Sequence, residues 1–160
     1  MNDKHKGHIE AIEAAMEEER KAADFYRNGA AKSGSAAGQA FLNQLADFEE
    51  HHFTKLKELR DSLASAHGFI EYEGKVLEAA ASAGGESERT EQKFDDVLDI
   101  LKLAIAAEEK AQQKYAELAA KTDDELGKRM FLKLAEEETH HRRILSDQFY
   151  QLNNHNGVWF

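Results

Sequence analysis

The feature that most constrains the fold of this chain is an internal repeat. Four pairs of residues recur at one separation, 89 positions (108 minus 19): Glu19 and Glu108, Tyr26 and Tyr115, Glu49 and Glu138, and His52 and His141. The chain has only 4 tyrosines and 8 histidines, so composition alone does not explain their common register. The surrounding segments also match, since LADFEEHH (45–52) resembles LAEEETHH (134–141) and EERKAADFY (18–26) resembles AEEKAQQKY (107–115). We therefore expect two copies of one structural unit.

Each copy has the pattern of two amphipathic helices. Proline is absent, and apolar residues recur at steps of three and four, which is typical of a helix with one face in a core. The clearest example is the series Leu45, Glu49, His52, Leu56, Leu59 and Leu63. The periodicity predicts helices over about residues 8–32, 39–66 and 90–121, and a fourth that follows a capping-box turn at 122–125 and ends near residue 152.

The connections between these helices predict the topology. The run KSGSAAG (32–38) is a short loop, residues 67–89 form a long connection, and the turn at 122–125 is short again. The long connection contains a possible short helix, EGKVLEAAASA (73–83). Two helical hairpins joined by one long crossover are typical of the ferritin-like bundle. We expect an all-α four-helix bundle of ferritin-like topology, with residues 1–160 as a single domain.

Composition excludes several classes of function. The net charge of −10 and the absence of basic runs interleaved with aromatics argue against nucleic-acid binding. The chain has no cysteine, which excludes disulfides, iron–sulfur clusters and thiolate zinc sites. No stretch is long and apolar enough for a signal peptide or a membrane span, so a cytoplasmic protein without a membrane segment is expected.

Ionisable side chains occupy core positions in all four predicted helices. Glu49 and His52 stand at i and i+3, close enough on one helix face to bind one metal ion or two adjacent ions. An unpaired carboxylate in an apolar core costs several kcal/mol, and four together would also repel one another, whereas two divalent cations would cancel their charge. Carboxylates and imidazoles without thiolates suit iron or manganese. We therefore expect two metal ions bound by Glu19, Glu49, His52, Glu108, Glu138 and His141.

Both copies contain two adjacent histidines, and we expect one histidine of each pair to bind metal. His140 follows Glu137 by three positions, but the equivalent of Glu137 in the first copy is Phe48, so only the second histidine of each pair has a glutamate at i−3 in both copies. The remaining glutamates are expected on solvated or flanking faces, with Glu50 or Glu137 near an entry path: Glu18, Glu50, Glu109, Glu136 and Glu137.

In each copy, one tyrosine follows the first glutamate by two helical turns. Tyr26 and Tyr115 could hydrogen-bond a ligand carboxylate and so support catalysis, or could simply pack in the core. Ala22 and Ala111, one turn from Glu19 and Glu108, would leave room for the site.

The motifs E-x-x-A-x-x-x-Y, in EERKAADFY and AEEKAQQKY, and E-x-x-H, in EEHH and ETHH, resemble those of the rubrerythrin group of the ferritin-like superfamily. The resemblance implies a di-iron centre with the six ligands named above, bridged by Glu49 and Glu138. Two departures stand out. Rubrerythrins of the peroxidase type have a further glutamate where this chain has Ala111, and they usually carry a cysteine-ligated iron domain that is missing here. A separate electron-donor protein would therefore be needed.

The expected function is that of a non-haem di-iron oxidoreductase that reacts with hydrogen peroxide or dioxygen. Three alternatives stay open: a ferroxidase or iron-handling protein, a manganese catalase-like site, and a non-catalytic helical module whose buried carboxylates are paired within an oligomer. We expect a homodimer, made either of closed bundles or of chains that exchange hairpins through the connection at 67–89.

Overall fold

The chain forms four long helices. The computed structural model describes residues 5–75, 77 and 91–154. Within that part of the chain, α1 spans Lys6–Lys32, α2 Ala36–Ala64, α3 Glu91–Lys121 and α4 Glu125–Asn154. The predicted all-α class is confirmed, and each helix boundary lies within three residues of its predicted place.

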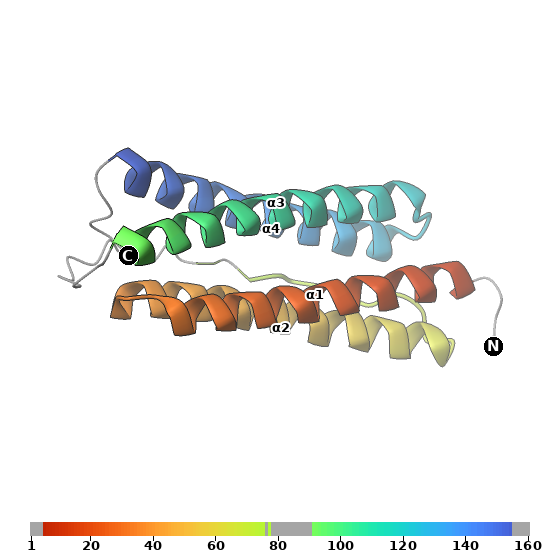
Figure 1. Ribbon diagram of the computed structural model, residues 1–160. Helices are drawn as coiled ribbons and strands as arrows, with labels where there is room; N and C mark the ends of the chain where they lie inside the picture. Colours follow the sequence, from red (N-terminus) through yellow and green to blue (C-terminus); the bar gives the residue numbers. More distant parts are fainter. Residues whose placement is uncertain (1–4, 76, 78–90, 155–160) are drawn as a thin grey trace.

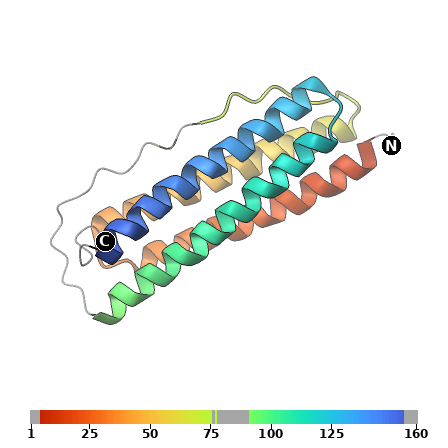
Figure 2. The same cartoon turned by 90° about the horizontal axis from the view of Figure 1, so that it is seen from above.

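The helices pack as two hairpins, α1 with α2 and α3 with α4, and the two hairpins form a bundle (Figure 1). Because α3 begins at the same end of the bundle as α2, these two helices run in the same direction (Figure 1). The connection between them must therefore cross the length of the bundle, and its described part runs back beside α4 (Figure 2). This is the ferritin-like topology that the loop lengths predict.

Side-chain caps determine where two of the helices begin. The Ser35 hydroxyl accepts a hydrogen bond from the Gly38 N–H at 3.0 Å, so α2 begins three residues before its predicted start. At the start of α4, Asp124 Oδ1 accepts from the Gly127 N–H at 3.1 Å. Thr122 instead donates to the Leu118 carbonyl in the last turn of α3. The cap of α4 is therefore Asp124, and the capping box predicted from Thr122 was wrong.

After α2 the chain leaves the helical conformation. Ala66 has a left-handed φ of 62°, and the His67 N–H donates to the Ser62 carbonyl at 2.8 Å, which closes the helix end. The short helix predicted over 73–83 is not formed at residues 73–75 and 77, and its other positions lie outside the described residues. The local reason is that Gly74 has a φ of 79° and that the Lys75 N–H bonds to a side chain of α4.

Two apolar clusters stabilise the bundle, one toward each end. One contains Phe41, Leu42, Leu45, Leu101 and Leu145, and the other contains Ile12, Leu56, Leu59, Phe131 and Leu134. Each fully buried aliphatic or aromatic side chain contributes roughly 1.5–3 kcal/mol of transfer free energy. The buried ionisable residues therefore lie between two apolar cores that hold the four helices together.

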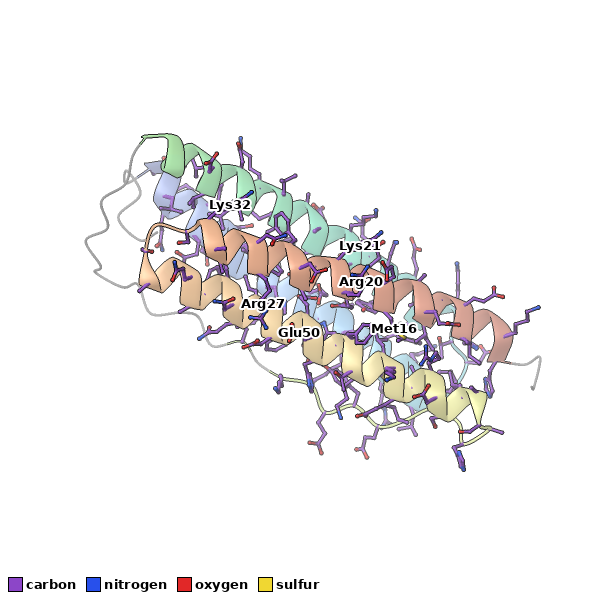
Figure 3. The ribbon with its side chains drawn as sticks, turned by 60° about the horizontal axis from the view of Figure 1, so that its bottom comes forward. Met16, Arg20, Lys21, Arg27, Lys32 and Glu50 are labelled. Carbon is purple, nitrogen blue, oxygen red and sulfur yellow. The ribbon has the colours of Figure 1, made fainter. Side chains whose placement is uncertain are left out.

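Polar contacts on the outer face join α1 to α2. The Arg27 guanidinium lies 3.2 Å from Glu50 Oε1 (Figure 3). It also donates to Asn43 Oδ1 at 3.1 Å. These groups are partly exposed, so each contact contributes about 1 kcal/mol or less. None of the described helices combines the length and apolarity that a membrane span requires.

Candidate metal centre

Six ionisable side chains meet between the two apolar clusters, at most 3% exposed. They are the six residues expected as ligands: Glu19, Glu49, His52, Glu108, Glu138 and His141. They form two groups, one of Glu19, Glu49, His52 and Glu138 and the other of Glu49, Glu108, Glu138 and His141. Within each group, one donor atom per residue lies within 4.8 Å of every other. Glu49 and Glu138 belong to both groups, so the arrangement is that of two adjacent metal positions that share two carboxylates.

Each of the six side chains has a buried oxygen or nitrogen atom that could bind a metal ion and that has no hydrogen-bond partner. These atoms are Glu19 Oε2, Glu49 Oε1, His52 Nδ1, Glu108 Oε2, Glu138 Oε1 and His141 Nδ1. A buried polar group left unpaired costs about 1–3 kcal/mol, and more when it is charged. Six such atoms in one place are therefore costly for the protein alone. The cost is removed if cations occupy the two groups, so these residues fit a dinuclear metal site.

The two imidazoles direct the same nitrogen toward the carboxylates. His52 Nδ1 lies 2.9 Å from Glu138 Oε1 and 3.4 Å from Glu19 Oε2. His141 Nδ1 lies 3.3 Å from Glu49 Oε1. The rings are nearly parallel, 14° apart with centroids separated by 6.1 Å. The duplicated hairpins therefore place the two histidines in equivalent orientations.

Each tyrosine bonds to the glutamate of the other hairpin. The Tyr26 hydroxyl donates to Glu108 Oε1, and the Tyr115 hydroxyl donates to Glu19 Oε1, both at 2.6 Å. In each glutamate the tyrosine engages one oxygen and the other oxygen is unpaired. The tyrosines thus orient two carboxylates and link the hairpins, as well as packing in the core.

Burial and mutual repulsion raise the pKa values of two of the buried carboxyl groups, those of Glu138 and Glu19. Burial raises the pKa of Glu138 well above its ordinary value, and the charges of Glu108, Glu49 and Glu19 raise it further. Burial and the charge of Glu49 likewise raise the pKa of Glu19. Burial disfavours the ionised form of Glu49 too, but the close approach of Glu19, His141 and His52 outweighs burial and lowers its pKa well below the ordinary value. Without metal, the cluster retains protons on some carboxyl groups.

The carboxylates in turn favour protonated imidazoles. Burial alone would lower the pKa of His141, but the Glu108 and Glu49 carboxylates outweigh it and raise the pKa to about 9. Burial alone would also lower the pKa of His52, but the charge of Glu19, the hydrogen bond to Glu137 and the nearby Glu138 carboxylate outweigh it and raise the pKa well above its ordinary value. In the metal-free protein, protons therefore supply part of the positive charge that the carboxylates require.

The donor set indicates which ions fit. Four carboxylates and two imidazole nitrogens, with no thiolate in the chain, suit iron or manganese and provide enough ligands for two ions. The neutral or anionic ligands that a divalent ion needs are available once the cluster releases its protons.

One buried acidic residue was missed by the sequence reasoning. Glu137, expected on a solvated or flanking face, is only 7% exposed, and its Oε2 lies 2.7 Å from His52 Nε2. The sequence signal that could have identified it is Phe48, the equivalent residue of the first copy. An apolar residue there indicates that this position faces the core. By contrast, Glu18, Glu50, Glu109 and Glu136 are exposed, as expected.

A cavity of about 460 Å³ lies between α1 and α3 and reaches the carboxylate cluster. Glu19, Glu49, Glu108 and Glu138 lie at its base. Apolar side chains provide part of its wall, and several of them are small: Ala22, Phe25, Leu103, Ala107 and Ala111. Because residues 22 and 111 are small, open space remains beside the cluster, as the sequence predicts. This space connects the cluster to the surface.

Similarity to known proteins agrees with this geometry. The rubrerythrin family model matches residues 99–158, which include Glu108, Tyr115, Glu138 and His141. Among solved structures, a hypothetical protein from Pyrococcus furiosus matches with a TM-score of 0.72 and 24% identity, over 96% of this chain and 94% of that one. No protein of curated function matches. The resemblance drawn from the motifs is thus confirmed for the second hairpin, whose residues 99–158 match the rubrerythrin family, within a bundle that shares the fold of the Pyrococcus protein.

Proposed function

We propose that this protein is a di-metal oxidoreductase whose six core ligands bind two iron ions and whose oxidant is hydrogen peroxide or dioxygen. The observation that carries the proposal is the set of six unpaired buried donor atoms, one from each expected ligand and all in one place. Two ferrous ions there would supply the two electrons that, with two protons, reduce hydrogen peroxide to two molecules of water.

The residues around the cluster have distinct proposed roles. Glu49 and Glu138, common to both groups, would hold both ions, while Glu19 and Glu108 would each complete one of the two positions. Tyr26 and Tyr115 hold the terminal carboxylates in orientation through their hydrogen bonds. Burial, together with the Glu108 charge, raises the pKa of the Tyr26 hydroxyl well above its ordinary value, so this group stays protonated and remains a hydrogen-bond donor at neutral pH.

The cavity between α1 and α3 is the proposed route of the oxidant. It is lined mainly by apolar atoms, which suits dioxygen or a small neutral molecule such as hydrogen peroxide better than an ion. The opposite side of the cluster, between α2 and α4, is covered by residues 72–75, which contact Glu137. The reducing electrons would come from a separate donor protein, because the chain has no cysteine to hold a second iron centre.

The direct test is an anaerobic titration of the metal-free protein with Fe(II), followed by a pulse of hydrogen peroxide. We expect saturation near two irons per chain and rapid formation of a ferric charge-transfer absorption after the pulse. Catalytic oxidation of Fe(II) beyond these two equivalents would instead identify a ferroxidase. If the parent protein binds neither iron nor manganese tightly, the proposal is wrong and the cluster is structural.

Substitutions that fill the cavity test the route of the oxidant without removing a metal ligand. We expect the double substitution Ala22→Leu with Ala111→Leu to slow the reaction of peroxide with the loaded protein by about tenfold or more, because the added side chains occupy the apolar space beside the ligands. Stopped-flow absorption measures the rate, and the number of bound irons should not change. The matched control is Ala120→Leu on the exposed face of α3, which should leave the rate unaltered.

A further inference from the structure

Part of the crossover bears directly on the metal centre. We call residues 72–75 the strap. The Tyr72 hydroxyl donates to Glu137 Oε2 at 2.6 Å and lies 3.0 Å from Oε1, and the Lys75 backbone N–H donates to Oε1 at 2.8 Å. Both oxygens of Glu137 therefore act as hydrogen-bond acceptors toward the strap. This carboxylate, in turn, is 2.7 Å from His52 Nε2.

The contact from Glu137 determines which nitrogen of His52 carries the proton. A carboxylate whose two oxygens accept from Tyr72 and Lys75 also accepts from the imidazole, so a His52 ring that binds metal through Nδ1 carries its proton on Nε2, directed at Glu137. Nδ1 then presents its lone pair to Glu19, Glu49 and Glu138. A carboxylate partner also makes a ligating imidazole more basic and fixes the angle of its ring.

Gly74 allows the strap to approach this closely. Its φ of 79° is in the region that favours glycine, and a Cβ there would lie 2.5 Å from Glu137 Oε1 and 2.9 Å from Lys133 Cε. Any side chain at position 74 would therefore push the strap away from Glu137. His140 Nε2, 3.2 Å from the Leu77 carbonyl, provides a further contact just beyond the strap.

The equivalent place in the other hairpin lacks this arrangement. Position 48, in register with Glu137, is phenylalanine, and its ring meets the His141 ring edge-on with centroids 4.5 Å apart. His141 Nε2 has no hydrogen-bond partner. The repeat that makes the ligands equivalent is therefore broken beside the two histidines.

We propose that the strap, acting through Glu137, positions His52 so that the group of Glu19, Glu49, His52 and Glu138 binds metal before, and more tightly than, the group of Glu49, Glu108, Glu138 and His141. Glu137 and Tyr72 are thus positioning residues. Loss of such an outer carboxylate typically lowers metal affinity by about 10–100-fold. The inference rests on the proposed metal centre, but it does not depend on the reaction with peroxide.

The test is a titration of the metal-free full chain with Co(II), whose visible spectrum reports each site as it fills. The parent should show two binding steps at least about tenfold apart. His52→Ala should remove the tighter step, and His141→Ala should retain it. In the proton NMR spectrum of the singly loaded protein, we expect one shifted, slowly exchanging imidazole N–H, that of His52.

Four variants test the role of the strap and of Glu137. Glu137→Gln should weaken the first step by about 10–100-fold and leave the second nearly unchanged. Gly74→Ala, which alters no ligand, and Tyr72→Phe should act in the same direction with smaller effects. The converse substitution Phe48→Glu, which copies the second hairpin into the first, should tighten the second step.

Different results separate the possible failures. Equal affinities in the parent, or equal weakening of both steps by Glu137→Gln and by the milder Tyr72→Phe, would refute the inference while leaving the metal centre intact. A merely structural role for Glu137 predicts the latter result. If the parent binds neither Co(II) nor Fe(II), the proposed function itself fails.

Discussion

Replacing Glu49 and Glu138 together with glutamine should abolish tight binding of both metal ions. These two carboxylates belong to both ligand groups, so the double substitution removes two anionic donors from each site at once. Glutamine keeps the shape of the side chain but lacks the charge that a hard divalent cation requires. The expected result in the Fe(II) titration is a loss of affinity of more than about a hundredfold, and no ferric absorption after peroxide.

The same variant should fold at least as well as the metal-free parent. Burial and neighbouring charges raise the pKa values of Glu19 and Glu138, which shows that the carboxylates destabilise one another when no cation is present. Urea unfolding in the presence of a chelator would measure the free energies of both proteins. The matched control is Glu50→Gln with Glu136→Gln, two exposed neighbours whose loss should affect neither metal binding nor stability by more than about 1 kcal/mol. Retention of tight binding by the core variant would exclude these residues as bridges.

The stability of the metal-free protein should fall as the pH rises from about 6.5 to 9. The pKa of His141 is raised to about 9 in the folded protein, compared with about 6.5 in the unfolded chain. Because the folded pKa is the higher one, the stabilisation is fully present below about pH 6.5 and is lost as the pH rises through the folded value. The loss is on the order of 3 kcal/mol for this group. Urea unfolding with chelator at several pH values measures it.

Metal binding should show the opposite trend over the same range. A divalent ion needs the unprotonated imidazole, so at pH 7 it must displace protons, and its apparent affinity should increase by about tenfold per pH unit toward pH 9. Binding should release protons, which calorimetry in buffers of different ionisation enthalpy detects. His141→Gln should make both the free energy of unfolding and the apparent metal affinity depend less steeply on pH. A rise of metal-free stability between pH 6.5 and 9 would contradict the assigned direction of the shift.

Much of the fold could be predicted because it depends on local and periodic signals. The steps of three and four, the absence of proline and the loop lengths together predict four helices in two hairpins, and Figure 1 shows this arrangement. The errors lie where side chains compete for backbone groups. Asp124 rather than Thr122 caps α4, and the segment at 73–75 bonds to α4 instead of continuing as a helix.

The candidate site could be located because the chain carries it twice. A single E-x-x-H on a glutamate-rich helix carries little information, but the common register of Glu49 with Glu138 and of His52 with His141 directs attention to one level of the bundle. Register alone, however, cannot show which oxygen of Glu108 accepts from Tyr26, or that each tyrosine crosses to the other hairpin. Those contacts depend on how the two hairpins face each other.

By itself the sequence determined the helices, their pairing and the six residues that meet in the core, because periodicity and repetition are properties of the chain's order. Only the tertiary structure showed that the difference between Glu137 and Phe48 lies against the two histidines of the centre. Glu137 is far from Tyr72 and His52 in sequence, and it becomes a buried partner of both only because the strap returns along α4. A contact made by a non-helical segment has no period in the sequence, so it could be found only when the chain was seen folded.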